Sequence, residues 1–282
     1  MRLVSLTTVF ALLLVAALTA RAERSSAPFA ETRSVAEHLR KLAREFPQRD
    51  AERFIKVGGS SVVSRAFLHC FAQDDVELGD REDLRPTLER LTRGRNPSFT
   101  RTSLATAVGY NLRHVLGGRP PLILREVRAM NPRFALVFMG PNDVMGKNPG
   151  VYERRLESAV DMLLAEGVMP ILGTIPPRPR NKEIDAWVGP FNEATARVAQ
   201  QRAVPLVDFH AAMSKLPGSG LARDGVHPNV YRAGGKTRPC DLGPEGLAYG
   251  HNVRNLLVLD ALDTLLRALD GRAEAPQVAL GR

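Results

Sequence analysis

Long apolar runs are almost absent from this 282-residue sequence, which limits how the chain can meet a membrane. The one run of note covers residues 3–20, follows a basic residue and ends in Ala-Arg-Ala at 20–22. This arrangement is typical of a secretory signal peptide cleaved after Ala22, and an uncleaved membrane anchor is the alternative. We therefore expect removal of residues 1–22, a secreted or periplasmic protein, and no stable membrane insertion after cleavage.

Cysteine is equally scarce, with only Cys70 and Cys240 in the whole chain. His69 adjoins Cys70, but no second Cys or His stands at ligand spacing, so the sequence predicts no metal site. Two cysteines in an exported protein are either one disulfide or two buried thiols. An oxidising compartment favours the disulfide, which would tie the segment after the first strand to the segment beyond Tyr231.

Nucleic-acid-binding motifs are also missing, although the chain is basic, with a formal net charge of +9 at pH 7. The Lys and Arg residues are scattered along the chain, so no nucleic-acid partner is expected. A basic surface would attract acidic partners such as anionic lipid headgroups or acidic polymers. The simpler interpretation, which we favour, is that these residues solvate the surface. The oligomeric state is not visible in the sequence.

The sequence does contain a repeating pattern of apolar runs and helical segments. Nearly continuous apolar runs lie at 54–57, 134–139, 168–174 and 204–209, with helical patterns at 152–166 and 182–202 between them. Strands without clean alternation, separated by helices, predict a parallel sheet covered on both faces. The fold class is therefore α/β, as a three-layer α/β/α domain, with a weaker further strand expected near 98–103.

This pattern divides the chain beyond the signal peptide into three parts. Residues 23–47 form an N-terminal extension with one amphipathic helix, from Ser34 to Phe46 behind a Ser N-cap. Residues 48–270 form the domain, which a Leu-rich helix from Pro244 to about residue 268 closes. The tail, 271–282, has no periodicity and is expected to be disordered.

The first strand runs into the turn Gly58-Gly59-Ser60-Ser61, at the sheet edge where ligands bind in open parallel sheets. The turn is not a phosphate loop, because no Lys followed by Ser or Thr comes after it. It is not a G-x-S-x-G elbow either, since Val62 replaces the second glycine. A serine at a strand-to-helix turn remains, with its hydroxyl exposed and its N–H pointing outward. An ordinary N-cap serine is the structural alternative.

A second segment, Asp-Gly-Val-His-Pro at 224–228, has the composition of a base and its partner. A hydroxyl nucleophile needs a base at neutral pH, and the base needs a group that holds its tautomer and stabilises its cation. Asp224 can orient His227 if the turn folds back. The same spacing also occurs in ordinary turns, but His227 is the only one of six histidines in this setting.

A third segment, Gly-Pro-Asn-Asp-Val at 140–144, follows a middle strand. Acyl transfer develops negative charge on the former carbonyl oxygen, and the Asn142 carboxamide can donate a hydrogen bond to it. Asn-Asp is also a common turn sequence. Taken together, a nucleophile, a donor and a base are predicted to meet on one rim of the sheet.

These segments resemble the blocks of the SGNH, or GDSL, hydrolase family. The matching positions are Ser60, Gly140, Asn142, Asp224, Gly225 and His227, and Thr-Ile-Pro-Pro at 174–177 is similar to the family's sequence after its next strand. The resemblance spans residues 53–268. It implies a flavodoxin-like parallel sheet and ester hydrolysis by a serine nucleophile, with no cofactor.

The resemblance also implies a role for each matching residue. Ser60 would be the nucleophile, His227 the base and Asp224 its partner. The oxyanion hole would consist of the Ser60 N–H, the Gly109 N–H and the Asn142 carboxamide.

Two departures from the family pattern stand out. The family's first block usually reads Gly-Asp-Ser, and Gly59 replaces the Asp whose side chain commonly organises that loop. The position of the family's second glycine is filled either by Gly109 or by Ser103, and Ser has a backbone N–H as well. Ser61 is a neighbouring rival to Ser60 as nucleophile.

The sequence leaves the substrate open. Short-chain or carbohydrate O-acyl esters are the first expectation, and a lipid-directed (lyso)phospholipase or lipase is the second. A non-catalytic ligand-binding protein on the same scaffold is the alternative from a different class. The loop 175–187, with two Arg, one Lys and the only Trp, either borders the pocket or is a solvated proline-rich connection. Gly140, Asp143 and Trp187 are the candidate substrate-binding residues.

Overall fold

A computed structural model describes residues 33–73, 76–94 and 96–272 of the chain. The predicted signal peptide and almost all of the predicted C-terminal tail lie outside these residues. None of the described helices is both long and apolar enough to cross a membrane.

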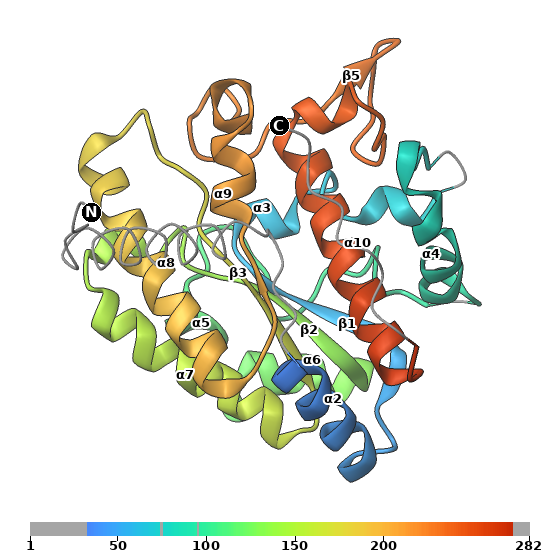
Figure 1. The fold of residues 1–282 in the computed structure, drawn as a ribbon. Helices are drawn as coiled ribbons and strands as arrows, with labels where there is room; N and C mark the ends of the chain where they lie inside the picture. Colours follow the sequence, from blue (N-terminus) through green and yellow to red (C-terminus); the bar gives the residue numbers. More distant parts are fainter. Residues whose placement is uncertain (1–32, 74–75, 95, 273–282) are drawn as a thin grey trace, which may run out of the picture.

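Four parallel strands form the central sheet in the order β1-β2-β3-β4 (Figure 1). The strands are β1 (Asp50–Gly58), β2 (Pro132–Phe138), β3 (Met169–Gly173) and β4 (Leu206–Val207). Each coincides with one of the four predicted apolar runs, and β2 and β3 are buried at every position. Continuous burial means that both faces of the sheet are covered, as expected for parallel strands.

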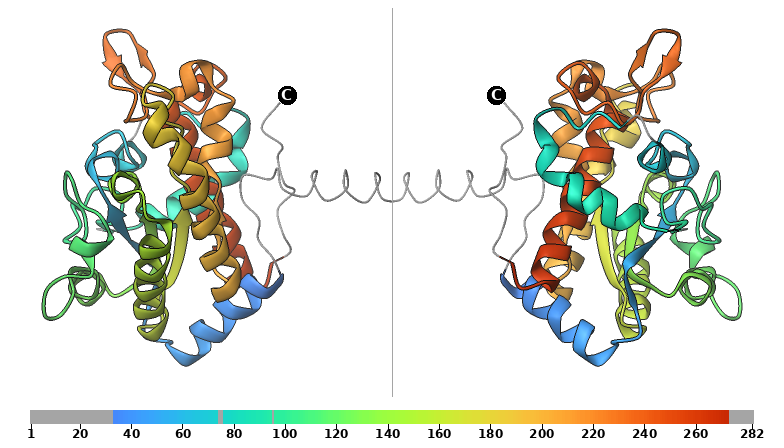
Figure 2. Two further views of the ribbon diagram at one scale, coloured as in Figure 1. Left: turned by 90° about the vertical axis from the view of Figure 1, so that its left-hand side faces the viewer. Right: turned by 90° about the vertical axis from the view of Figure 1, so that its right-hand side faces the viewer.

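Helices cover the sheet in two layers, which confirms the three-layer α/β/α prediction (Figure 2). On one side, α10 (Gly250–Leu269) packs against α2 (Arg33–Glu45) and α4 (Arg85–Thr92). On the other side, α7 (Pro149–Ala165) packs against α6 (Leu122–Met130) and α8 (Lys182–Arg202). The chain also forms α3 (Ser60–Val63), α5 (Leu112–Val115), α9 (Phe209–Ser214), the 3-10 turns η1 (His69–Ala72), η2 (Gly79–Leu84), η3 (Val144–Gly146), η4 (Pro217–Gly220) and η5 (Gly246–Ala248), and the hairpin β5 (Arg232–Ala233) and β6 (Lys236–Thr237).

Three predicted helix starts differ from the structure. Helix α7 begins at Pro149, three residues before the predicted start at Tyr152. Helix α2 forms as predicted, but Ser34 lies inside it and is not its N-cap. Helix α10 begins at Gly250, because residues 244–249 form a loop and the short turn η5 instead. Helix α8 has the predicted bounds, and its N-cap Asn181 accepts a hydrogen bond from Ile184 N.

The expected fifth strand near 98–103 does not form. Thr100 N and Arg101 N both donate to Pro97 O, so the chain turns there. The Ser98 hydroxyl, not a strand carbonyl, accepts from Phe54 N at 3.1 Å. The only bridge to β1 in this part of the described chain comes just after the segment, between Gly58 and Thr106.

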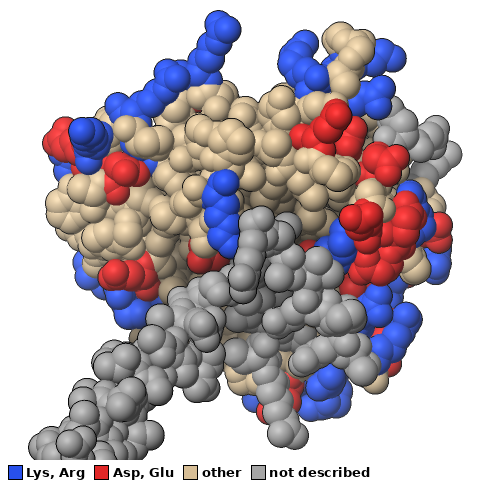
Figure 3. All heavy atoms as spheres, turned by 45° about the horizontal axis from the view of Figure 1, so that its top comes forward, with Lys and Arg blue, Asp and Glu red and all other residues tan. Residues whose placement is uncertain are grey.

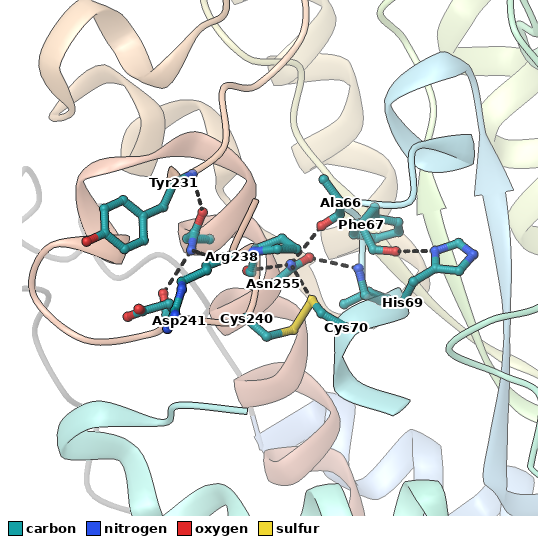
Figure 4. The surroundings of a disulfide bond; sticks show 12 residues. Ala66, Phe67, His69, Cys70, Tyr231, Arg238, Cys240, Asp241 and Asn255 are labelled. Carbon is teal, nitrogen blue, oxygen red and sulfur yellow. Dashed lines mark hydrogen bonds between the residues drawn. A yellow bond between two sulfur atoms is a disulfide. The ribbon is translucent and has the colours of Figure 1, made fainter. Parts of the chain in front are cut away.

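A disulfide joins Cys70 in η1 to Cys240 beyond the β5–β6 hairpin, which confirms the predicted pairing (Figure 4). The Asn255 carboxamide of α10 lies beside it and binds backbone groups of both segments, including Leu68 N at 3.1 Å and Pro239 O at 3.0 Å. Covalent and polar contacts thus fix the chain that follows β1 to the last helix.

Candidate active site

The carboxyl ends of the strands meet at one edge of the sheet, the upper edge in Figure 1. Gly58 at the end of β1 pairs with Phe138 at the end of β2, and Val137 pairs with Leu172 of β3. The loops that leave these strands therefore start at nearly the same level. One cavity, partly open to solvent, lies among them.

The turn after β1 presents Ser60 to this cavity. Val62 N and Val63 N both donate to Gly59 O, which starts the four-residue helix α3 at Ser60. Within the described residues, no hydrogen bond uses the N–H of Ser60. The orphaned N–H of a first helical residue is available to an external acceptor.

Ser60, His227 and Asp224 form a continuous chain of hydrogen bonds. Ser60 Oγ lies 2.6 Å from His227 Nε2, and His227 Nδ1 lies 2.7 Å from Asp224 Oδ2. Ser61 also lines the cavity, but within the described part of the chain no hydrogen bond joins its hydroxyl to His227. The structure therefore brings the first of the two adjacent serines to the imidazole.

A tight local turn holds Asp224 against His227. Asp224 Oδ1 accepts from Val226 N at 2.9 Å and from His227 N at 3.0 Å. Burial alone would raise the pKa of Asp224, but these hydrogen bonds and the His227 ring outweigh it and lower the pKa to about 2. Gly225 permits the turn, because it has a φ of +67° and an added Cβ would lie 2.6 Å from Arg180 Cδ.

Asn142 reaches the same cavity from the loop after β2. Its Nδ2 donates to Tyr110 O at 2.7 Å, which fixes the orientation of the carboxamide. An added Cβ on Gly59 would lie only 2.8 Å from this Nδ2. The φ of Gly59 is −90°, so the glycine is needed for space, not for its backbone conformation. A larger side chain at position 59 would therefore require the Asn142 carboxamide to shift.

Of the two candidates for the second glycine position, Gly109 directly precedes Tyr110, whose carbonyl holds Asn142. Its φ is +81°. In the described part of the chain no hydrogen bond uses the N–H of Gly109 or that of Ser103. Ser103 is buried, and its hydroxyl accepts from Ala105 N at 3.0 Å. Neither residue lines the cavity in this structure.

The three predicted substrate-binding residues do not line the cavity either. Asp143 turns inward, where it accepts from Leu112 N at 3.0 Å and Gly140 N at 3.2 Å, and burial raises its pKa. Gly140 has no room for a side chain, because an added Cβ would lie 2.6 Å from Ile175 Cγ1. Trp187 is half-buried in α8 and packs against the core. Gly140 and Asp143 thus shape the loop after β2, whereas Trp187 anchors α8 to the core.

A model of the GDSL-like lipase/acylhydrolase family matches residues 79–231, more than half of the chain. The chain belongs to this family. The protein is accordingly a hydrolase that acts on ester bonds. The matched region includes Asn142, Asp224 and His227, whereas Ser60 precedes it.

Several solved structures of other hydrolases are similar in fold. They include the alpha/beta hydrolase LAE5 from the metagenome of Lake Arreo (22% identity, 76% of this chain and 96% of that chain, TM-score 0.47). A GDSL-like lipase from Bacteroides thetaiotaomicron (18%, 81% and 98%, 0.46) and the acetylxylan esterase Axe2 from Geobacillus stearothermophilus (16%, 76% and 95%, 0.49) are further examples. A search of curated proteins found no match.

The cavity of this GDSL-like hydrolase also contains two arginines that the sequence alone did not single out as site residues. Arg178 comes from the loop after β3, for which the sequence leaves both a pocket border and a solvated connection open, and Arg254 comes from α10. Arg254 could have been noticed in the sequence, because it is a charged residue within the Leu-rich segment that forms α10. Within the described residues, no cluster of three or more His, Cys, Asp or Glu side chains could hold a metal ion.

Proposed function

We propose that this GDSL-like hydrolase is a serine esterase that uses Ser60 as its nucleophile. The observation that carries the proposal is the unbroken chain from Ser60 Oγ through the His227 ring to Asp224, with both contacts at hydrogen-bond distance. Ser60 Oγ bonds to the ester carbonyl carbon while its proton passes to His227 Nε2. His227 then gives the proton to the departing alcohol as the C–O bond breaks. A water molecule repeats the sequence on the acyl-enzyme and releases the acid.

The proposed oxyanion hole has three donors. The Ser60 N–H and the Gly109 N–H have no acceptor within the described part of the chain, and Asn142 Nδ2 has a second hydrogen besides the one bound to Tyr110 O. Donors that are already oriented stabilise the tetrahedral intermediate without further reorganisation. No cofactor takes part in this mechanism.

Short-chain or carbohydrate O-acyl esters are the substrates that we propose first. The cavity is partly open to solvent, and its mostly apolar lining carries a few polar groups, among them Ser60, Asn142 and His227, which suits a small acyl group beside the nucleophile. A lipid-directed activity is the second candidate, because the loops that carry Tyr110 and Asn142 expose three apolar side chains. These are Leu104 (40% exposed), Val108 (76%) and Met145 (59%).

The test compares Ser60→Ala with Ser61→Ala on a short-chain aryl ester, after circular dichroism has shown that both variants fold. We expect Ser60→Ala to lower kcat by roughly 10⁴- to 10⁶-fold and Ser61→Ala to keep most of the activity. A fluorophosphonate should label the wild type and Ser61→Ala but not Ser60→Ala. Full activity in Ser60→Ala would refute the assigned nucleophile, and an unlabelled, inactive wild type would favour a ligand-binding protein.

We also propose that the protein is exported. The Cys70–Cys240 disulfide supports this, because structural disulfides persist in oxidising compartments. N-terminal sequencing of the exported protein should begin at Glu23. Protein that stays in the cytoplasm with residue 1 intact would contradict the proposal.

A further inference from the structure

Two arginines line the cavity although both are almost completely buried. Arg178 is 6% exposed and Arg254 is 1% exposed. In the described residues, no Asp or Glu lines the cavity with them. Burying a charged group without a partner is costly, so such side chains are retained where something supplies the missing partner.

Arg254 is held in position mostly by aromatic rings. Its guanidinium carbon lies 3.9 Å from the ring centroid of Phe67, 4.6 Å from that of Phe138 and 5.4 Å from that of Phe209. Its Nη1 donates to Ser61 O at 3.2 Å, whereas Nε and Nη2 have no acceptor in the described part of the chain. Burial lowers the pKa of Arg254 to about 9, so the group is still charged at neutral pH. It is a fixed cation with unused donors, directly beneath the Ser60–Ser61 turn.

Arg178 approaches the cavity from the loop after β3. Its Nη2 donates to Pro141 O at 3.0 Å, and its Nε has no acceptor among the described residues. Asp224 is the carboxylate that favours its charged form, but that carboxylate is already bound to His227. Figure 3 shows both basic and acidic side chains at the two ends of the upper rim of this face, with a mostly uncharged surface between them.

We propose that the cavity binds an anionic group of the ester substrate, a carboxylate or a similar oxyanion, through Arg178 and Arg254. This inference rests on the proposed function, because it places the anion beside Ser60. The guanidinium is planar and carries its N–H groups in a fixed fork that matches a carboxylate. The anion could belong to the acyl half or to the alcohol half of the ester, and both halves offer the same chemistry to the two arginines.

The test measures hydrolysis of matched ester pairs in a pH-stat. Ethyl hydrogen succinate carries the anion in its acyl half, with ethyl pentanoate as its neutral counterpart. Acetoxyacetate carries the anion in its alcohol half, with propyl acetate as its neutral counterpart. We expect kcat/KM for at least one anionic ester to exceed that of its counterpart by about 10- to 100-fold, as for a charge-assisted hydrogen bond. The preferred pair identifies the half that carries the anion, and equal rates within both pairs would overturn the inference.

Variants distinguish direct binding of the anion by Arg178 and Arg254 from attraction by the overall positive charge of the protein. Arg178→Gln and Arg254→Gln should each lower the ratio of anionic to neutral kcat/KM by about tenfold or more. The matched control is Arg232→Gln in β5, which removes the same charge from an exposed side chain outside the cavity lining. Its ratio should stay that of the wild type. An equal loss in Arg232→Gln and Arg178→Gln would show that only the surface charge matters and would overturn the inference.

A binding measurement keeps the inference testable apart from catalysis. Ser60→Ala protein, which should not cleave the ester, is titrated with ethyl hydrogen succinate and with acetoxyacetate by calorimetry. Saturable binding of either one that is lost in the Ser60→Ala, Arg178→Gln double variant supports the anion site, even if Arg254→Gln does not fold. No binding of either probe counts against it. Hydrolysis that depends on Ser60 but shows no anion preference overturns this inference alone, whereas hydrolysis that does not depend on Ser60 overturns the proposed function.

Discussion

A buried arginine lies near each end of strand β2, and the two differ in how many of their guanidinium N–H groups have acceptors. At the amino end, Arg133 is 2% exposed and donates to the carbonyl of Gly167 at 2.9 Å and to carbonyls at the end of α2 and in the α2–β1 connection. At the carboxyl end, Arg254 packs over Phe138 and, within the described residues, donates only to Ser61 O. The chain occupies most donors of the first guanidinium and leaves most donors of the second unused.

This difference in hydrogen bonding indicates that the amino end of the sheet serves stability and the carboxyl end serves ligand binding. Satisfied buried donors stabilise the fold, whereas unsatisfied ones cost free energy that other parts of the fold must offset. Such a cost is expected where a ligand completes the contacts. Changes at the amino end should therefore alter stability, and changes at the carboxyl end should alter turnover or specificity.

The largest effect should come from removing the amino-end arginine. Arg133→Met removes the buried hydrogen bonds from this guanidinium to the carbonyls of Leu42, Phe46 and Gly167, so the free energy of unfolding should fall by about 3–5 kcal/mol, while kcat/KM of the folded protein stays near that of the wild type. Denaturant unfolding and an ester assay measure the two quantities. Arg197→Met, at a side chain that is 48% exposed, is the control and should change stability by less than about 0.5 kcal/mol. A loss of turnover at unchanged stability would break the comparison.

Next in size is the effect of Asn142→Ala at the carboxyl end. Loss of one oxyanion donor should lower kcat by about 10²- to 10³-fold, while stability falls only by the roughly 1 kcal/mol of the bond to Tyr110 O. Asn148→Ala is the matched control, because Asn148 caps α7 through Val151 N and does not line the cavity. It should cost about 1 kcal/mol of stability and leave kcat unchanged. Similar turnover in both variants would remove Asn142 from the oxyanion hole.

Gly59→Ala should have a smaller effect on the same donor. The added methyl group needs the space of Asn142 Nδ2, so the carboxamide must shift, and we expect kcat to fall about tenfold with KM little changed. Gly189→Ala is the control, since that helical glycine has nothing within 4 Å of an added Cβ. It should stabilise the protein by about 0.5–1 kcal/mol without changing kcat. A wild-type kcat in Gly59→Ala would show that the short distance between position 59 and Asn142 Nδ2 does not affect catalysis.

The smallest effect near neutral pH concerns His251, which lies one turn before Arg254. Burial, then the Arg254 charge, then His227 lower the pKa of His251 to about 3. Between pH 6.5 and 3 the unfolded chain binds a proton that the folded protein does not, so stability falls as pH falls, by at most about 1.4 kcal/mol per pH unit. His251→Gln removes this term, so its unfolding free energy should depend less steeply on pH over that range. Parallel pH dependences of the two proteins would show that His251 is protonated in the fold.

Much of the fold could be predicted because strands of a parallel sheet are buried on both faces and therefore appear in the sequence as continuous apolar runs. The apolar runs of β2 and β3 are long enough to be read without their neighbours, and α8 was predicted with its observed bounds. The segment 98–103 was misjudged because hydrogen bonds from other parts of the chain decided it: Ser98 Oγ replaces a strand carbonyl, and Pro97 O turns the chain. The start of α10 was missed for a related reason, since Asn229 Oδ1 and Asn229 O accept from Gly250 N and His251 N.

The amino-acid sequence is enough to predict the four strands and the main helices in their order along the chain. It also predicts the chemical types at the site: a hydroxyl, an imidazole with an acid three residues before it, and a carboxamide. It favours a disulfide between the two cysteines and leaves two buried thiols as the alternative. These inferences follow from local composition and spacing. The folded structure is needed to show that the cysteines are joined, which serine meets the imidazole, which group a side chain at position 59 would displace, and that Arg178 and Arg254 share one cavity. Those facts depend on contacts between segments up to 193 residues apart, such as Arg254 and Ser61. A local sequence pattern does not show which distant segments come into contact, because those contacts are set by how the segments pack in the fold.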